Sequence, residues 1–184
     1  MKKLTALILC LALTLSCTAA LAETAEKTNM GTVNLNGAFK ARCVLPEGYT
    51  METTEMDNGG LLSTILSKDP AKPILMLSIM FDEMYAEVKK LNDLDDEAIA
   101  YIESTFTDEY EVEISYQETI HGTKLMVVKE ANNAFADVYT IYEGYEFEFV
   151  LFPSVEGGAE SLTDDQIQIV IEFLGNLDFI PVEE

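Results

Sequence analysis

Residues 137–152, DVYTIYEGYEFEFVLF, predict a β-hairpin. In the second half of this segment, aromatic or aliphatic side chains alternate with mostly acidic ones, and a period of two is typical of a strand with one buried face. Glu143-Gly144 separates the two apolar runs, and a glycine at this position favours a tight turn. We therefore expect residues 137–142 to pair with residues 145–152.

Other segments on both sides of this hairpin show the same strand pattern. Apolar residues at alternating or consecutive positions, bounded by turn residues, predict strands over 39–45, 61–66, 74–81, 111–120 and 124–130. Leu177 and Phe179 end the chain as a short extended segment.

Two segments have the spacing of helices instead. Between residues 84 and 106 an apolar residue recurs at every fourth position, which predicts a helix with one apolar face: Leu94, Ala98, Ile102 and Phe106. Asp93, Asp95 and Asp96 lie where this helix is expected to begin and complement the positive end of its dipole. The second helix begins with the capping box Thr163-Asp164-Asp165-Gln166, in which Thr and Gln side chains satisfy free amide groups. Gly175 is placed to end it.

Strands joined by hairpins, with two helices between them, predict an α+β fold built on an antiparallel sheet. We expect one domain over residues 36–180 with a single continuous apolar core. Residues 23–35 are polar and predict a flexible N-terminal segment.

The first 22 residues resemble a secretory signal peptide. Lys2 and Lys3 precede an apolar run over residues 4–15, and Ala20-Leu21-Ala22 supplies the small residues that a signal peptidase reads. This predicts cleavage after Ala22 and a secreted or extracytoplasmic protein. The alternative is lipidation at Cys17, since Leu15-Ser16-Cys17 resembles the end of a lipobox, and the protein would then be lipid-anchored at the cell surface.

The order of these elements resembles that of PsbP-like domains. The resemblance begins with Pro46-Glu47-Gly48-Tyr49 and continues through a middle helix and strands around His121-Gly122-Thr123 to a closing helix. It implies a curved antiparallel sheet flanked by helices, and it covers residues 36–180. Members include extrinsic photosystem subunits, a Ran-binding import factor and exported bacterial proteins, whose known roles are mostly binding and assembly. No site motif of that family is matched here.

The charge of the chain restricts its partners. Residues 1–22 hold two of the 11 basic residues and none of the 33 acidic ones, so the remaining chain has nine basic against 33 acidic residues and a net charge of −24. Arg42 is the only arginine. Such a charge repels nucleic acid and anionic lipid, and no remaining segment is apolar for long enough to span a membrane. We expect neither a nucleic-acid partner nor a membrane span.

Few residues are candidates for catalysis or metal binding. Cys43 and His121 are the only cysteine and histidine after residue 22, and we expect a buried, inert thiol and a solvated imidazole rather than a nucleophile–base pair. The sequence Asp93-x-Asp95-Asp96-Glu97 resembles the start of a calcium loop, although helix capping explains the same residues. We expect no cofactor and no catalytic residue, and leave a weak calcium site open.

Two functional classes remain. The first is an exported, non-catalytic binding or assembly module with a protein or peptide partner, for which a cluster of aromatic residues in the hairpin offers a contact surface: Tyr139, Tyr142, Tyr145 and Phe147. Cross-strand packing of these rings is the alternative. The second class is a small-ligand carrier or an enzyme with a pocket between sheet and helices. A concave pocket with converging polar groups would favour the second class, and a flat aromatic patch or a free strand edge the first.

Overall fold

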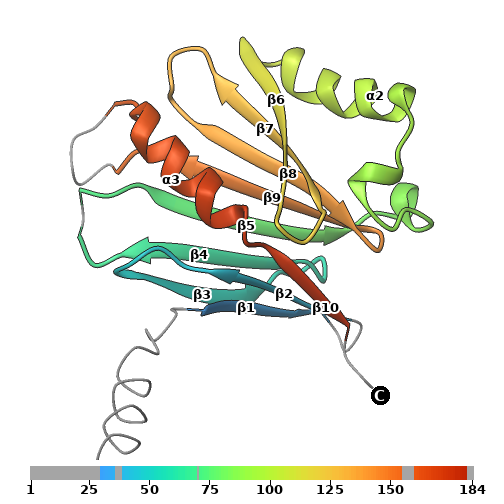
Figure 1. The fold of residues 1–184 in the computed structure, drawn as a ribbon, viewed down its shortest axis with the longest axis horizontal. Coiled ribbons are helices and arrows are strands. Elements are labelled where there is room, and N and C mark those ends of the chain that lie inside the picture. Colours follow the sequence, from blue (N-terminus) through green and yellow to red (C-terminus); the bar gives the residue numbers. More distant parts are fainter. Residues whose placement is uncertain (1–29, 36–38, 70, 155–159, 182–184) are drawn as a thin grey trace, which may run out of the picture.

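The computed structural model describes residues 30–35, 39–69, 71–154 and 160–181. These residues form two antiparallel β-sheets, two α-helices and two short 3-10 helices (Figure 1). The fold is thus mixed and mostly sheet, in loose agreement with the predicted α+β class. No helix in the described part of the chain is long and apolar enough to cross a membrane. The predicted signal peptide and Cys17 lie outside the described residues.

The larger sheet has seven strands and is built around the predicted hairpin. Its order is β3-β4-β5-β9-β8-β7-β6, with all neighbours antiparallel. Tyr142 lies opposite Tyr145 across the turn, which confirms the predicted hairpin. The strands are β3 (Tyr49–Glu55), β4 (Leu61–Ser67), β5 (Ile74–Phe81), β6 (Val112–Glu118), β7 (Lys124–Glu130), β8 (Ala136–Tyr142) and β9 (Tyr145–Phe152).

The smaller sheet joins the two ends of the described chain. Strand β2 (Phe39–Val44) lies between β1 (Met30–Leu35) and β10 (Asp178–Pro181). The prediction of a flexible segment over residues 23–35 is wrong for residues 30–35, because these pair with β2 and bury Val33 and Leu35. Val33 and Leu35 alternate with exposed residues, a strand period that is easily lost among polar neighbours. Residues 23–29 lie outside the described part.

Helix α2 (Asp96–Thr107) begins where the acidic residues predict it. The Asp95 side chain accepts a hydrogen bond from the Ala98 amide at 2.9 Å, which satisfies one of the free donors at the helix start. The region before it contains the 3-10 helices η1 (Glu83–Tyr85) and η2 (Leu91–Asp93). Leu91 and Tyr85 bury their side chains there.

Helix α3 (Asp164–Leu174) confirms the predicted capping box. The Gln166 amide donates to Thr163 Oγ1 at 3.2 Å, and the Thr163 amide donates to Gln166 Oε1 at 2.8 Å. Figure 1 shows α3 crossing one face of the seven-stranded sheet, while α2 lies beside its β6 end. The two helices therefore belong to different parts of the fold.

The seven-stranded sheet separates two apolar clusters. The larger cluster lies between one face of this sheet, the β1-β2-β10 sheet and α3, and includes Phe147 and Phe149. The smaller cluster lies on the other face, where Ile102 of α2 meets Met126 and Val128. The prediction of one continuous core is wrong, because a sheet covered on both faces divides its apolar contacts into two layers.

Candidate functional site

A cleft of about 570 Å³ lies on the α2 face of the seven-stranded sheet. Helix α2 and the 3-10 helices cover the β6–β8 side of this face, and the alternating residues of β5 and β9 continue beyond them. One wall is therefore α2 and the segment after it, and the floor is β5, β9 and β8. This volume lies within the range of small-molecule sites, roughly 300–1,000 Å³.

Aromatic and acidic side chains dominate the cleft lining. No Lys, Arg or His lines it among the residues that the structure describes. The acidic residues are Asp82, Glu109, Asp137, Glu146 and Glu148, and the aromatic residues are Tyr85, Tyr101, Phe106, Tyr110, Phe135, Tyr139 and Phe152.

Asp137 of β8 is the most unusual of these residues. Its side chain is only 3% exposed, and its Oδ1 atom has no hydrogen-bond partner within the described part of the chain. Burial, the charge of nearby Glu148 and a hydrogen bond with Glu148 raise the pKa of Asp137 from 3.8 to about 9. At neutral pH the carboxyl group is therefore protonated and donates to Glu148.

A second acidic pair extends along the floor. The Tyr139 hydroxyl donates to Glu146 Oε1 at 2.5 Å, and burial together with this bond raises the pKa of Tyr139. Burial also raises the pKa of Glu146, opposed by the Tyr139 bond and supported by the charges of Asp82 and Glu148. The carboxylates of Asp82, Glu146 and Glu148 thus repel one another inside one half-enclosed cleft.

Comparison of the chain with models of known protein families and with curated proteins gives no match. The site is therefore interpreted from its own geometry.

The chemistry available in the cleft is that of acceptors and aromatic faces. Buried polar atoms of native proteins nearly always have a hydrogen-bond partner, so the free Oδ1 of Asp137 calls for a donor. A positive charge would lower the repulsion among the carboxylates and interact with the aromatic rings. A metal ion fits less well, since no group of three or more metal-ligating side chains occurs in the ranges described.

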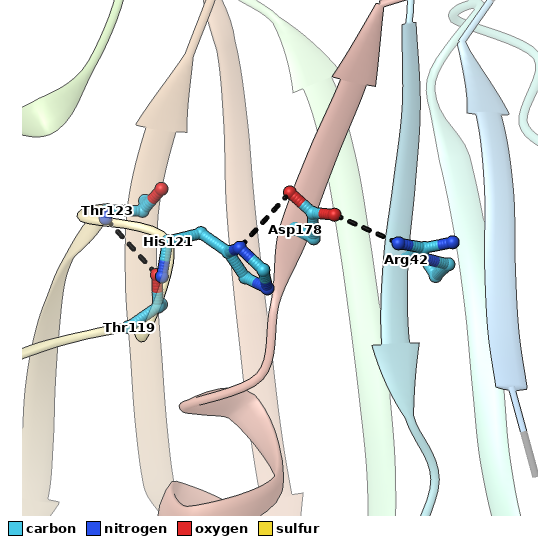
Figure 2. A network of polar contacts seen from close by, with 5 residues as sticks. All are labelled: Arg42, Thr119, His121, Thr123 and Asp178. Carbon is cyan, nitrogen blue, oxygen red and sulfur yellow. Dashed lines mark hydrogen bonds and ion pairs between the residues drawn. The ribbon is translucent and has the colours of Figure 1, made fainter. Parts of the chain in front are cut away.

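Cys43 and His121 lie outside this cleft. Cys43 is 5% exposed and free, and burial raises its pKa to about 11, which confirms the predicted burial. His121 lies in the β6–β7 turn with its Nδ1 atom 3.8 Å from Asp178 Oδ1, and Asp178 Oδ2 lies 3.1 Å from Arg42 Nη2 (Figure 2). Arg42 is on the exposed face of β2 and Cys43 on the buried face, so the strand separates the thiol from this network.

The acidic segment considered for calcium has a structural role. Asp95 caps α2, and Asp93 Oδ2 accepts from the Lys90 amide at 3.1 Å. Both carboxylates accept hydrogen bonds from backbone amides at the start of a helix, as the alternative of helix capping predicts.

The aromatic residues of the hairpin divide between the two faces of the sheet. Phe147 is fully buried, and the Tyr142 ring stacks on Phe179 with centroids 4.1 Å apart. Tyr145 packs edge-on against Phe39 at 5.5 Å. The four candidate aromatic residues of the hairpin, Tyr139, Tyr142, Tyr145 and Phe147, therefore pack within the fold and form no flat exposed patch.

The sequence interpretation missed the carboxyl groups of the cleft. One signal was available for Asp137: strand β8 is otherwise almost free of charge, and strands buried on both faces are nearly continuous in apolar residues. An aspartate in such a strand is a buried polar residue, which is the informative exception.

Proposed function

We propose that this protein is a small-ligand-binding protein whose site is the cleft between α2 and the β5-β9-β8 floor. The observation that carries this proposal is Asp137, a 97% buried carboxyl group that borders the cleft with one oxygen free of hydrogen bonds. That oxygen is almost fully shielded from solvent in the empty protein, and a ligand donor that reaches it would satisfy it. The converging acidic and aromatic side chains support the same assignment.

The strand edges offer less to a peptide partner. Among the described strands, β3 and β6 end the larger sheet, and both edges carry glutamates such as Glu52, Glu55 and Glu113. Charged residues on an edge strand oppose pairing with another strand. These edges therefore favour a pocket-based role over docking of an added strand.

The paired carboxyl groups support binding more than glycoside hydrolysis. Asp137 and Glu148 share a hydrogen bond, whereas the two carboxyl groups of a retaining glycosidase lie about 5–5.5 Å apart to accommodate the sugar. A non-catalytic role is accordingly the proposal.

Export and the PsbP-like relationship belong to the same proposal. The signal-like residues 1–22 and the element order from residue 36 to residue 180 support an exported protein with a sheet flanked by helices, as in PsbP-like domains. Intact mass of the protein purified from its native cell tests the export. A mass beginning at Glu23 supports secretion, a diacylglycerol on Cys17 supports surface anchoring, and retention of Met1 contradicts export.

A fragment screen by heteronuclear NMR tests the ligand-binding role. We expect hits to shift amide resonances of the cleft residues on β8, β9 and α2. Thr105→Trp places a large ring in the cleft and should abolish these shifts, since Thr105 lines it. Thr107→Trp, two residues further along the same helix and outside the lining, is the matched control and should retain them. Hits that shift only residues outside the cleft would contradict the proposal.

A further inference from the structure

The acidic groups of the cleft form two centres spaced along strand β9. Glu148 is hydrogen-bonded to Asp137, and Glu146 lies near Asp82 and accepts from Tyr139. Glu146 and Glu148 are two residues apart on the same face of the strand, so their backbone positions differ by roughly 7 Å at about 3.4 Å per residue. The cleft therefore presents two negative centres at a fixed spacing.

No cation of the described chain neutralises either centre. The ion pairs within the described ranges lie elsewhere, between Asp178 and its partners Arg42 and His121, and between Lys129 and Asp164. Carboxylates gathered in a half-enclosed cleft repel one another, and this repulsion is relieved when positive charge enters. The complementary ligand is therefore positively charged at two points.

The surface around the two centres suits an apolar spacer. Met80 pairs with Glu146 across β5 and β9, and Tyr101 and Phe106 project from α2 into the lining. Methylene groups pack well against such thioether and aromatic surfaces, and aromatic faces also attract ammonium groups. The free Oδ1 of buried Asp137 adds a further requirement, because this acceptor needs a hydrogen-bond donor and a quaternary ammonium has none.

Resting on the proposed ligand-binding function, we infer that the cleft binds a linear aliphatic diamine with primary ammonium groups at both ends. One ammonium donates to the Asp137–Glu148 centre and the other to the Glu146–Asp82 centre, while the methylene chain lies along the floor between them. A chain of four or five carbons spans a distance close to the separation of the two centres.

Calorimetric titration at about 150 mM salt, which screens the general acidity of the surface, tests this inference. The probes are 1,5-diaminopentane, pentylamine, 1,5-pentanediol and tetramethylammonium. We expect saturable 1:1 binding of the diamine, binding of pentylamine weaker by about tenfold or more, and no measurable binding of the other two. Across diamines of three to eight carbons, affinity should peak at four or five.

Variants assign the binding to the two centres. Glu148→Gln should weaken diamine binding by about tenfold or more, because it removes one charge of a partly desolvated pair. Glu146→Gln, at the other centre, should do the same and provides a second test if Glu148→Gln does not fold. The double variant Glu52→Gln with Glu55→Gln removes two exposed charges from β3, far along the sheet order, and should change the affinity less than about twofold.

The outcomes separate this inference from the proposed function. Equal binding of all diamine lengths, or equal loss in the β3 control, would show attraction to the acidic surface only and overturns the inference. Binding of the diol or of an anionic fragment to the cleft, without diamine binding, overturns the ligand class but leaves the ligand-binding role standing. If the NMR screen finds no cleft ligand of any charge, both fail.

Discussion

Asp137 of β8 and Glu148 of β9 share a hydrogen bond on the α2 face of the seven-stranded sheet. The two residues are not paired directly across the strands. Asp137 lies opposite Val150, so Glu148 is its diagonal neighbour two residues along β9. Diagonal neighbours are within reach of longer side chains. The contact holds one buried carboxyl group neutral beside a half-exposed one, which makes the protonation of Asp137 a determinant of stability.

We predict that Asp137→Asn stabilises the empty protein at neutral and higher pH. The folded state holds a proton on Asp137 up to a pKa of about 9, whereas the unfolded chain releases it near 3.8. Stability from this group is therefore fully present below about pH 4 and is lost as pH rises towards 9. Asparagine needs no proton uptake, so the gain at pH 7 should be about 1–4 kcal/mol, given about 1.4 kcal/mol per pKa unit.

Urea unfolding of both proteins between pH 4 and pH 9 measures this effect. The difference between the variant and the parent should be near zero at pH 4 and increase with pH. The other titratable groups around the cleft, Glu146, Glu148, Glu109 and Asp82, are present in both proteins, so the difference isolates Asp137. A constant difference across this pH range would mean that Asp137 titrates normally in the folded state.

Most of the sheet could be predicted from sequence because its strands have strong local patterns. The hairpin from Asp137 to Phe152 alternates apolar and acidic residues and carries its own turn, and the Thr163 capping box marks the start of α3. In contrast, β1 and β3 are polar edge strands, and each pairs with only one strand, the next one along the chain. Their local signal is weak, because they hold few apolar residues and much of a strand's preference comes from packing against its neighbours.

The candidate site could not be predicted because it depends on which face of the sheet α2 covers. Glu146 and Glu148 have the spacing of an ordinary solvated strand face. Only the position of α2 beside β6–β8 turns that face into a half-enclosed cleft with Tyr101 and Phe106 on its wall. The chain after residue 22 has a net charge of −24 and therefore many exposed carboxylates, so the sequence alone does not distinguish Glu146 and Glu148 from the others.

We predict that Phe147→Ala destabilises the protein by about 3–5 kcal/mol. The Phe147 side chain is fully buried, and its ring centroid lies 4.9 Å from that of Phe179 and 6.3 Å from that of Phe39, so it joins the two sheets. Removing it leaves a cavity between them. Phe152→Ala, on the same strand but 38% exposed, is the matched control and should cost less than about 1 kcal/mol. Similar costs for both variants in urea unfolding would place Phe147 outside the core.

We predict that the Cys43 thiol reacts slowly in the folded protein. It is 5% exposed, and burial raises its pKa to about 11, so little reactive thiolate is present at pH 8. Labelling with a thiol reagent, followed by peptide mass mapping, should show Cys43 modified orders of magnitude faster in denaturant than in buffer. Comparable rates in the two conditions would indicate an exposed thiol.

Finally, we predict that folding does not depend on a metal ion. The two apolar clusters account for a core of ordinary size, and the acidic residues Asp93 and Asp95 are already engaged with backbone amides. The large negative charge nevertheless destabilises the folded state by self-repulsion, and salt should relieve this, since the Debye length is about 8 Å at physiological ionic strength.

Thermal unfolding in chelator, sodium chloride and calcium chloride tests this prediction. We expect a similar midpoint in chelator and in plain buffer, and equal increases in the two salts at matched ionic strength, because screening depends on ionic strength and not on a particular ion. Asp95→Asn, which keeps a side-chain acceptor for the cap, should leave the response to calcium unchanged. A midpoint raised by calcium well beyond the sodium control, and lost in Asp95→Asn, would instead assign this segment to calcium binding.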